Sequence, residues 1–416
     1  MRNACRKYSI EYFRSATVAG AQVKSPNFST GKVSPISPAT GTTDAPKNVF
    51  GITQAFLQSQ NKFPKKNHFL FPHQAKHFRA DVNQYLGTQT MTGCRAITGS
   101  IFSDHDMQRH DESGSRLRAA IAGIPSDVPV NPPDAASDDD LGRVHYPSHI
   151  RFIREMCSHG GTHFLDNNTY ITARSFFVAA HAAGASIGAV TRALDGEHCF
   201  ALVRPPGHHA EPDRAMGFCL FNNAAIAASV ALDRADRVAI VDWDLHHGNG
   251  TQKIFYTSDR VLFCSVHQGN IFPRTGWVDE IGEGAGRGYT INAPLRAGCG
   301  IADYRHVFEN IFVPAIERFQ PGVLIVSAGQ DPLADDPHGG MRLVPADFGL
   351  LTALLMTAVD MPLALVLEGG YGPSHGDAIR QIFSALKGTI RVPEPDPVLP
   401  RDSTQQVVSL LKKLVI

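Results

Sequence analysis

Residues 238–250 read VAIVDWDLHHGNG, a short apolar run followed by carboxylates, imidazoles and glycines. The run Val238–Asp242 is almost wholly apolar, which is typical of a strand covered on both faces. Residues two apart on an extended chain point the same way, so the side chains of Asp244 and His246 can converge on one ion. This stretch therefore predicts a buried strand with a metal site at its C-terminal end.

Similar apolar runs alternate with stretches that suit helices along the rest of the chain. The predicted strands are Cys199–Arg204, Val238–Asp242, Val261–Val266, Tyr289–Ala293, Val323–Ser327 and Leu363–Leu367. The predicted helices are Ser115–Ile124, Ser148–Cys157, Ala173–Leu194, Asn222–Arg234, Ile301–Phe319 and Pro345–Val359. Alternation of this kind predicts an α/β fold, a three-layer α/β/α sandwich around a mostly parallel sheet.

Polar and titratable residues follow four of these predicted strands. They occupy Pro205–His209, Asp242–Asn249, Gln330–Asp331 and Gly369–Tyr371. In parallel α/β sheets the functional site lies at the C-terminal ends of the strands. An isolated Asp-x-His pair is more often a surface or capping pair. Here polar residues also follow three other predicted strands, which favours a functional site.

Asp331, at a different strand end, can supply a third ligand beside Asp244 and His246. Two carboxylates and one imidazole with an open position suit a catalytic zinc ion and leave room for water and substrate. We therefore expect one catalytic Zn²⁺ as the cofactor.

The tandem histidines His208 and His209 sit in a loop that two prolines and a glycine, residues 205–207, make stiff. A stiff loop holds two imidazoles at fixed positions, and each ring is oriented by an acceptor. Asp242 and Asn249 are the expected acceptors. A single histidine is usually structural, whereas a tandem pair after a strand is typical of a reactive site.

Two glycines precede Tyr371, and they let the backbone pass close to a ligand. The Tyr371 hydroxyl then points into the site, where it can donate to the oxyanion of a tetrahedral intermediate. Without the metal site, a core tyrosine after a turn would be the default interpretation.

Charge is distributed unevenly along the chain. The whole sequence has 39 Lys and Arg and 39 Asp and Glu, a formal net charge of zero, which indicates neither direct nucleic-acid binding nor a membrane surface. Residues 1–90 carry twelve basic and three acidic residues, a net of +9, so the remainder carries −9. An acidic catalytic body favours cationic substrates through long-range steering that salt screens.

The seven cysteines are scattered and form no Cys-x-x-Cys pair, which argues against a disulfide scaffold and fits a reducing compartment. The first thirty residues lack the apolar core of a secretory signal. The most apolar stretch, Leu350–Leu367, is interrupted by Asp360 and Pro362, so it suits a helix and a buried strand better than a membrane span. We expect a cytoplasmic protein that does not enter a membrane.

Three regions are expected. Residues 1–95 are rich in Ser, Thr, Lys and Asn and lack a sustained period, so they are predicted to be disordered. They are either an organellar targeting peptide, which would change the location, or sequence upstream of a start at Met91, and the second interpretation is slightly favoured. Residues 96–390 form the predicted catalytic domain, and residues 391–416 a C-terminal tail with a short helix.

The ordered set of motifs resembles the arginase/deacetylase superfamily and, within it, the histone deacetylase and acetylpolyamine amidohydrolase branch. The motifs are Pro205–His209, Gly217–Cys219, Phe221–Asn223, Asp242–Gln252, Ser327–Asp331, Asp336–Pro337 and Glu368–Tyr371. The likeness runs from about Phe102 to about Leu386, and the stretches 242–252 and 335–340 resemble class II members. This resemblance implies a sheet of about eight strands.

The resemblance also implies a role for each matching residue. Zinc would be bound by Asp244, His246 and Asp331, with His208 and His209 as the general acid/base pair and Tyr371 as the carbonyl polariser. The substrate tunnel would be formed by Gly217, Phe218, Phe272 and Gly370, with His338 at its mouth and Arg116 guarding the channel for acetate release. A structural potassium ion would be held by Asp242, Asp244, His246, Ser265 and Val266, and a second by Phe255, Ser258, Val261 and Tyr289.

Three positions depart from patterns in the family. Asn249 stands where class I members carry an aspartate, so His209 should be less basic. Gln330 replaces an apolar residue before Asp331. His338 stands where many class II members have leucine and polyamine deacetylases an acidic residue, which leaves the choice of substrate open.

The expected function is zinc-dependent hydrolysis of an N-acetylated amine, foremost acetyl-lysine in proteins, with release of acetate. An acetylpolyamine or small-acylamine amidohydrolase is the alternative. A ureohydrolase would need a binuclear manganese site and a further Asp-x-Asp ligand run, which the chain lacks. A non-catalytic acyl-lysine binding protein should have lost a ligand or the tyrosine, and here every position is filled.

Overall fold

The structure, a computed structural model, describes residues 93–394 and 398–415. The predicted N-terminal extension lies outside the described residues except for its last three. Its two interpretations therefore remain predictions.

Eight strands form one sheet in the order β2-β1-β5-β10-β9-β6-β7-β8, and every pairing in it is parallel. The strands are β1 (Cys94–Ile97), β2 (Val130–Asn131), β5 (His198–Ala201), β6 (Val238–Asp242), β7 (Val261–Gln268), β8 (Thr290–Leu295), β9 (Val323–Ala328) and β10 (Leu363–Leu367). A separate antiparallel pair consists of β3 (Thr162–Phe164) and β4 (Tyr170–Thr172). The predicted parallel sheet of about eight strands is confirmed.

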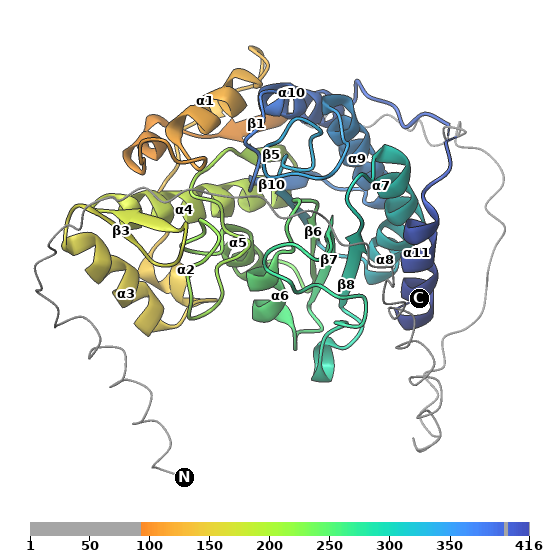
Figure 1. The fold of residues 1–416 in the computed structure, drawn as a ribbon, viewed down its shortest axis with the longest axis horizontal. Coiled ribbons are helices and arrows are strands. Elements are labelled where there is room, and N and C mark those ends of the chain that lie inside the picture. Colours follow the sequence, from red (N-terminus) through yellow and green to blue (C-terminus); the bar gives the residue numbers. More distant parts are fainter. Residues whose placement is uncertain (1–92, 395–397, 416) are drawn as a thin grey trace, which may run out of the picture. The chain divides into compact units, whose positions relative to one another are not determined.

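Helices flank the sheet on both faces, and Figure 1 shows the central strands between α9 and α10 on one side and α4 and α5 on the other. The helices are α1 (Gly114–Ala122), α2 (Asp138–Gly142), α3 (Pro147–Ser158), α4 (Ser175–Leu194), α5 (Asn223–Ala231), α6 (Asn249–Phe255), α7 (Ile301–Val307), α8 (Val313–Phe319), α9 (Pro345–Ala358), α10 (His375–Leu386) and α11 (Asp402–Leu414). This arrangement confirms the predicted α/β sandwich.

The central strands β6, β9 and β10 are buried at every position, as their apolar runs predicted. Their register aligns their C-terminal ends, because Asp242 pairs with Ser327 and Leu367 pairs with Ala328. The loops that leave these ends therefore start side by side at one edge of the sheet.

Two predicted elements differ from the structure. β5 ends at Ala201, where its pairing with β1 and β10 stops, and Arg204 lies beyond the sheet, with its guanidinium in a buried ion pair with Glu112, 2.6 Å between Nη2 and Oε2. The predicted single helix Ile301–Phe319 is divided into α7, a π-helical turn η3 (Phe308–Phe312) and α8. Pro314, in the first turn of α8, has no N–H to donate to the preceding turn, so the regular ladder cannot continue through it.

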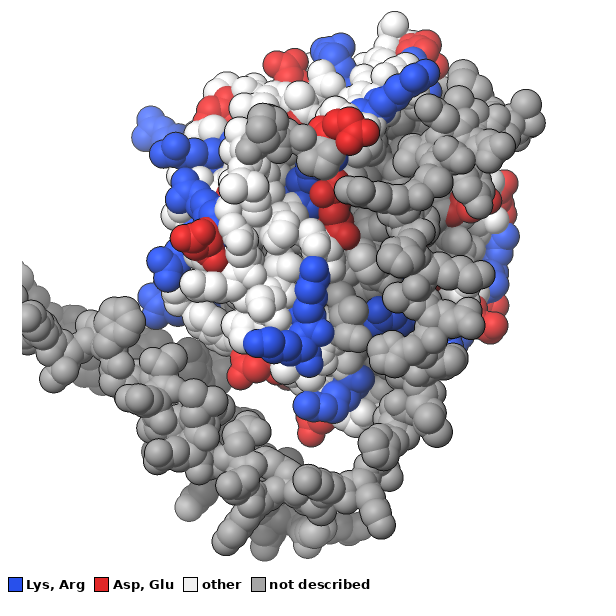
Figure 2. All heavy atoms as spheres, turned by 90° about the vertical axis from the view of Figure 1, so that its right-hand side faces the viewer, with Lys and Arg blue, Asp and Glu red and all other residues white. Residues whose placement is uncertain are grey.

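The C-terminal helix α11 packs against α7 and β8 through buried side chains that include Val408 and Leu411. Figure 2 shows the face of the molecule that lies on the right of Figure 1, where α11 is found. Basic and acidic side chains are interspersed there among uncharged residues. The charge on the described part of this face is therefore mixed rather than of one sign.

Helix α4 is long and apolar enough, by length and composition, to cross a membrane. In this fold it is a core helix that packs against α5, β5 and β10. Its small residues allow close approach, most tightly at Gly184, where an added Cβ would lie against the Asp134 carbonyl oxygen and 2.7 Å from the Ala136 nitrogen. That segment is hydrogen-bonded to the helix, since Ala136 N donates to Ala180 O.

We predict that Gly184→Ala destabilises the fold, although alanine favours a helix over glycine by about 0.5–1 kcal/mol. The new methyl group meets backbone atoms that are fixed to α4, and such overpacking costs about 1–3 kcal/mol. The free energy of unfolding, measured by urea titration, should fall. Gly142→Ala is the matched control, because an added Cβ on this glycine of α2 meets nothing within 4 Å. Equal stability of the two variants would contradict the packing argument.

Candidate active site

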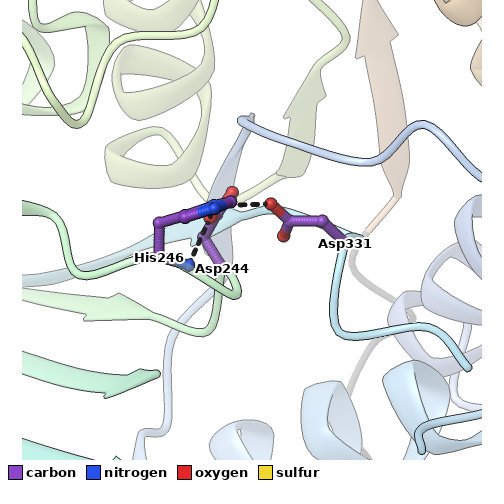
Figure 3. A group of neighbouring side chains, drawn as sticks. All are labelled: Asp244, His246 and Asp331. Atoms are coloured by element: carbon purple, nitrogen blue, oxygen red, sulfur yellow. Dashed lines mark hydrogen bonds and ion pairs between the residues drawn. The ribbon is translucent and has the colours of Figure 1, made fainter. Parts of the chain in front are cut away.

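Three potential metal ligands converge at the ends of β6 and β9. Asp244 and His246 follow β6 and Asp331 follows β9, and one ligand atom from each lies within 4.8 Å of the others. Figure 3 shows the three side chains pointing toward one another. The His246 Nδ1 atom lies 3.1 Å from Asp331 Oδ2 and 3.4 Å from Asp244 Oδ1. Two carboxylates and an imidazole are a donor set that suits Zn²⁺, so the residues fit the predicted ion.

The main chain fixes the outer oxygens of both carboxylates. Leu245 N donates to Asp331 Oδ1 over 2.8 Å, and Gly369 N donates to Asp244 Oδ2 over 2.8 Å. The approach of Gly369 requires the absence of a side chain, because an added Cβ would meet Asp331 Oδ2 and lie 2.7 Å from Asp244 Oδ2. Loops from three strands thus orient the ligands before any ion binds.

The two carboxylates are almost completely buried, and their charges influence each other. Burial and the charge of Asp244 raise the pKa of Asp331 to about 7. Burial also opposes ionisation of Asp244, yet the imidazoles of His208 and His246 hold its pKa below the ordinary value. A bound divalent cation would relieve the repulsion between the carboxylates, which makes the group suited to one.

The predicted histidine pair lies beside these ligands, with ring centroids 4.0 Å apart. His208 Nδ1 is 3.0 Å from Asp242 Oδ2, and His209 Nδ1 is 2.8 Å from Asn249 Oδ1, so both expected acceptors are in contact. Asn249 Nδ2 donates to a Glu211 oxygen, which leaves Asn249 Oδ1 as the acceptor for His209.

The pKa values of the two rings shift in opposite directions, although both rings are buried. Burial lowers the pKa of His208, but the carboxylates of Asp244 and Asp242 outweigh it and raise the pKa well above the ordinary value. Burial, reinforced by the charge of His208, lowers the pKa of His209 well below the ordinary value. His208 is therefore the more basic and His209 the less basic member of the pair.

Glu368, which the sequence placed in a motif without a role, ties three strand ends together. Its Oε2 atom accepts from Gly207 N at 2.7 Å and His208 N at 3.1 Å, and its Oε1 atom accepts from Ser327 Oγ at 3.1 Å. Burial raises the pKa of Glu368 to about 7. The signal in the sequence was an acidic residue directly after a wholly apolar strand.

Tyr371 is positioned by contacts to its backbone and ring. Asp336 Oδ2 accepts from Tyr371 N at 2.6 Å and from Gly372 N at 3.0 Å. The Arg116 guanidinium lies 5.0 Å from the centre of the Tyr371 ring, and Arg116 Nε donates to Gly370 O at 2.7 Å. Burial raises the pKa of the Tyr371 phenol well above its ordinary value, so the hydroxyl keeps its proton and can donate.

The ligands, the histidine pair and Tyr371 surround one cavity of about 150 Å³. It is lined by Asn168, Pro206, His208, His209, Gly217, Phe218, Asp244, His246, Phe272, Asp331, His338, Gly369 and Tyr371. Gly217 has a positive φ of 57°, and an added Cβ there would lie 2.5 Å from His209 Cδ2 and 2.9 Å from Phe272 Cε1. Glycine is thus required where the wall of the cavity meets the histidine pair.

Some predicted residues lie away from the lining, and some lining residues were not predicted. Arg116 and Gly370 lie behind Tyr371 and do not line the cavity. Asn168 lines it without having been assigned a role, and Pro206, which was predicted only to stiffen the histidine loop, lines it as well. Asn168 lies in a turn of the chain between β3 and β4, a position that no sequence pattern related to the strand ends.

The residues predicted for potassium form two groups at opposite ends of β7. In the first, Asp242 pairs with Ser265 in the sheet, next to Val266, and its Oδ1 accepts from the backbone of the potential metal ligand Asp244. In the second, Ser258 N donates to Phe255 O just before Val261, and Phe263 N donates to Tyr289 O. Both potassium sites remain predictions.

Comparison with known proteins agrees with this geometry. The family model described as the histone deacetylase domain matches residues 105–386. A probable deacetylase of Archaeoglobus fulgidus is 41% identical over 341 residues, covering 76% of this chain and 94% of the relative. The histone deacetylase-like amidohydrolase of Pseudomonas aeruginosa is 38% identical over 301 residues, covering 68% and 79%.

A plant relative and a solved structure extend the comparison. Histone deacetylase 5 of Arabidopsis thaliana is 36% identical over 333 residues, and the match spans 74% of this chain but only 50% of the relative. The crystal structure of the HDA15 HD domain superposes with a TM-score of 0.73 at 32% identity, covering 78% of this chain and 95% of that chain. The chain described here belongs to the histone deacetylase family.

Proposed function

We propose that this protein is a zinc-dependent deacetylase that hydrolyses the amide of N-acetylated amines, foremost acetyl-lysine in proteins, and releases acetate. One observation carries the proposal: the cavity that Asp244, His246 and Asp331 face is also lined by the tandem histidines His208 and His209 and by Tyr371. The names of the relatives support deacetylase activity independently. The free, scattered cysteines of the described residues suit a reducing compartment such as the cytoplasm.

Zinc held by Asp244, His246 and Asp331 would supply a Lewis acid and a bound water of lowered pKa, roughly 7 in favourable sites. The protein's own groups then handle the protons. His209 binds Asn249 Oδ1 through Nδ1–H, which leaves Nε2 free to accept a proton from the attacking water. His208, the more basic member of the pair, can carry the proton that is donated to the departing amine.

Tyr371 completes the site by donating its hydroxyl proton in a hydrogen bond to the carbonyl oxygen as negative charge develops there. The aromatic rings of Phe218 and Phe272 flank the cavity and offer an apolar wall to the aliphatic chain that carries the amide. A cavity of about 150 Å³ suits a narrow linear chain better than a bulky group. The shape therefore supports an acetylated primary amine as the substrate class.

We predict that Asp331→Ala loses bound zinc and deacetylase activity together, because it removes the ligand that comes from a separate strand. Metal analysis and release of a fluorophore from an acetyl-lysine reporter measure the two effects. A hydroxamate chelator should likewise inhibit the wild-type protein. Asp139→Ala, an exposed change on α2, serves as the control. Stoichiometric zinc in Asp331→Ala would refute the ligand assignment.

Tyr371→Phe should keep the fold and the metal but lower kcat by a factor of about 10²–10³, the usual effect of removing one oxyanion donor. KM should change much less, since the hydroxyl acts chiefly in the transition state. Steady-state kinetics on the reporter, with zinc content as a control, test this. A nearly normal kcat would show that another group stabilises the oxyanion.

Asn249→Asp should raise the pKa of His209, because a carboxylate replaces a neutral amide beside the ring. If neutral His209 is the base, the acidic limb of the kcat/KM profile moves to higher pH. An NMR titration of the His209 ring proton gives the pKa directly. Asn310→Asp, which adds the same charge in the η3 turn, should leave both measurements unchanged. An unshifted His209 pKa in Asn249→Asp would contradict the proposed control of this base.

A further inference from the structure

A hydrogen-bonded histidine and aspartate lie at the mouth of the cavity. His338 lines the cavity, and its ring centroid is 4.7 Å from that of Tyr371 and 6.3 Å from that of Phe218. On its other side, His338 Nε2 lies 2.9 Å from Asp111 Oδ2. The Asp111 carboxylate, 227 positions earlier in the chain, is thereby held beside the entrance.

Both partners of this pair are held by their neighbours. His338 N donates to Asp336 Oδ1 at 2.9 Å, and the other oxygen of Asp336 binds the backbone of Tyr371. His110 stands edge-on to Phe218, with centroids 5.0 Å apart, and its Nε2 lies 2.9 Å from Asn168 O. Glu112, which follows Asp111 in the chain, forms a buried ion pair with Arg204. Asp111 is therefore fixed between two anchored residues.

The carboxylate is available to a substrate. The Asp111 side chain is 60% exposed and the His338 side chain 28%, so a carboxylate oxygen remains open to solvent at the entrance. No Lys or Arg is among the residues that line the cavity in the described part of the chain. A cationic group outside the cavity thus meets an acidic side chain in fixed position, and among the described residues neither lysine nor arginine lines the cavity that it faces.

We propose that Asp111 is a specificity-determining residue that selects substrates carrying a second cation, an ammonium or guanidinium group, just beyond the acetylated amine. This inference rests on the proposed deacetylase function and names its substrate class more narrowly. The cation has two sources, a basic residue beside acetyl-lysine in a protein or the second amine of an acetylated diamine or polyamine. Both offer the same chemistry to the Asp111 carboxylate.

Matched substrate pairs test the proposal on the zinc-loaded full chain. One pair is an acetyl-lysine peptide with arginine beside the acetyl-lysine and the same peptide with neutral citrulline. The other pair is an N-acetyldiamine and an N-alkylacetamide of equal length. Wild-type kcat/KM should favour the cationic member by about two- to five-fold, the range for one partly exposed ion pair, mainly through KM. The pair with the larger ratio identifies the source of the cation.

Asp111→Asn keeps the size of the side chain and should bring the ratio close to one while leaving kcat/KM for the neutral members unchanged. Asp139→Asn, which removes the same charge from exposed α2, should retain the wild-type ratio. The wild-type ratio should also shrink at high salt, because exposed charges are screened. Equal losses on both members of a pair, or an unchanged ratio in Asp111→Asn, would overturn the proposal.

A binding measurement separates this proposal from the proposed function. Calorimetric titration of Tyr371→Phe protein and its Asp111→Asn double variant with the peptide pairs measures the charge preference in binding, while turnover is slow. If the wild-type protein fails to cleave the reporter yet prefers cationic peptides through Asp111, deacetylation fails and the role of Asp111 stands. If cleavage is normal and no charge preference appears, the deacetylase function stands and the role of Asp111 is refuted.

Discussion

Repulsion between two buried carboxylates governs this structure. Asp244 and Asp331 lie where water cannot screen them, and like charges in such a place disfavour each other's ionisation. Main-chain N–H groups of Leu245 and Gly369 and the ring of His246 offset that repulsion. These groups belong to loops that follow different strands, β6 and β10. They can therefore stabilise the two carboxylates only while the sheet keeps its register.

Glu368 is a further buried carboxylate that is held by hydrogen-bond donors from neighbouring loops. Its carboxylate is fully buried and accepts hydrogen bonds from Ser327 at the end of β9 and from the loop that carries His208. The histidine pair is therefore attached to the same strand ends as the potential metal ligands. Because each carboxylate depends on donors from a neighbouring loop, the chemistry and the parallel sheet stabilise each other.

The sequence predicted those parts of the fold and site that depend on local pattern. β6 and β10 have the predicted bounds because a run buried on both faces is apolar from end to end. The edge strand β2 was missed because it is two residues long and only partly buried, and α6 because it begins inside the metal motif at Asn249. The ligands share strand ends and were found together, whereas the contact of Asp111 with His338 joins loops that no periodicity relates.

The residues of the site differ in how many neighbours hold them, and this difference determines which substitutions the fold can tolerate. Changes at Gly217, Gly369 or Glu368 meet fixed neighbours on several sides, so few sequences are tolerated there. Asp111 and His338 touch each other at a partly exposed rim, and replacing them leaves the strand ends intact. Substitutions at the rim can therefore change the charge at the entrance of the cavity without disturbing the hydrogen bonds that join the strand ends.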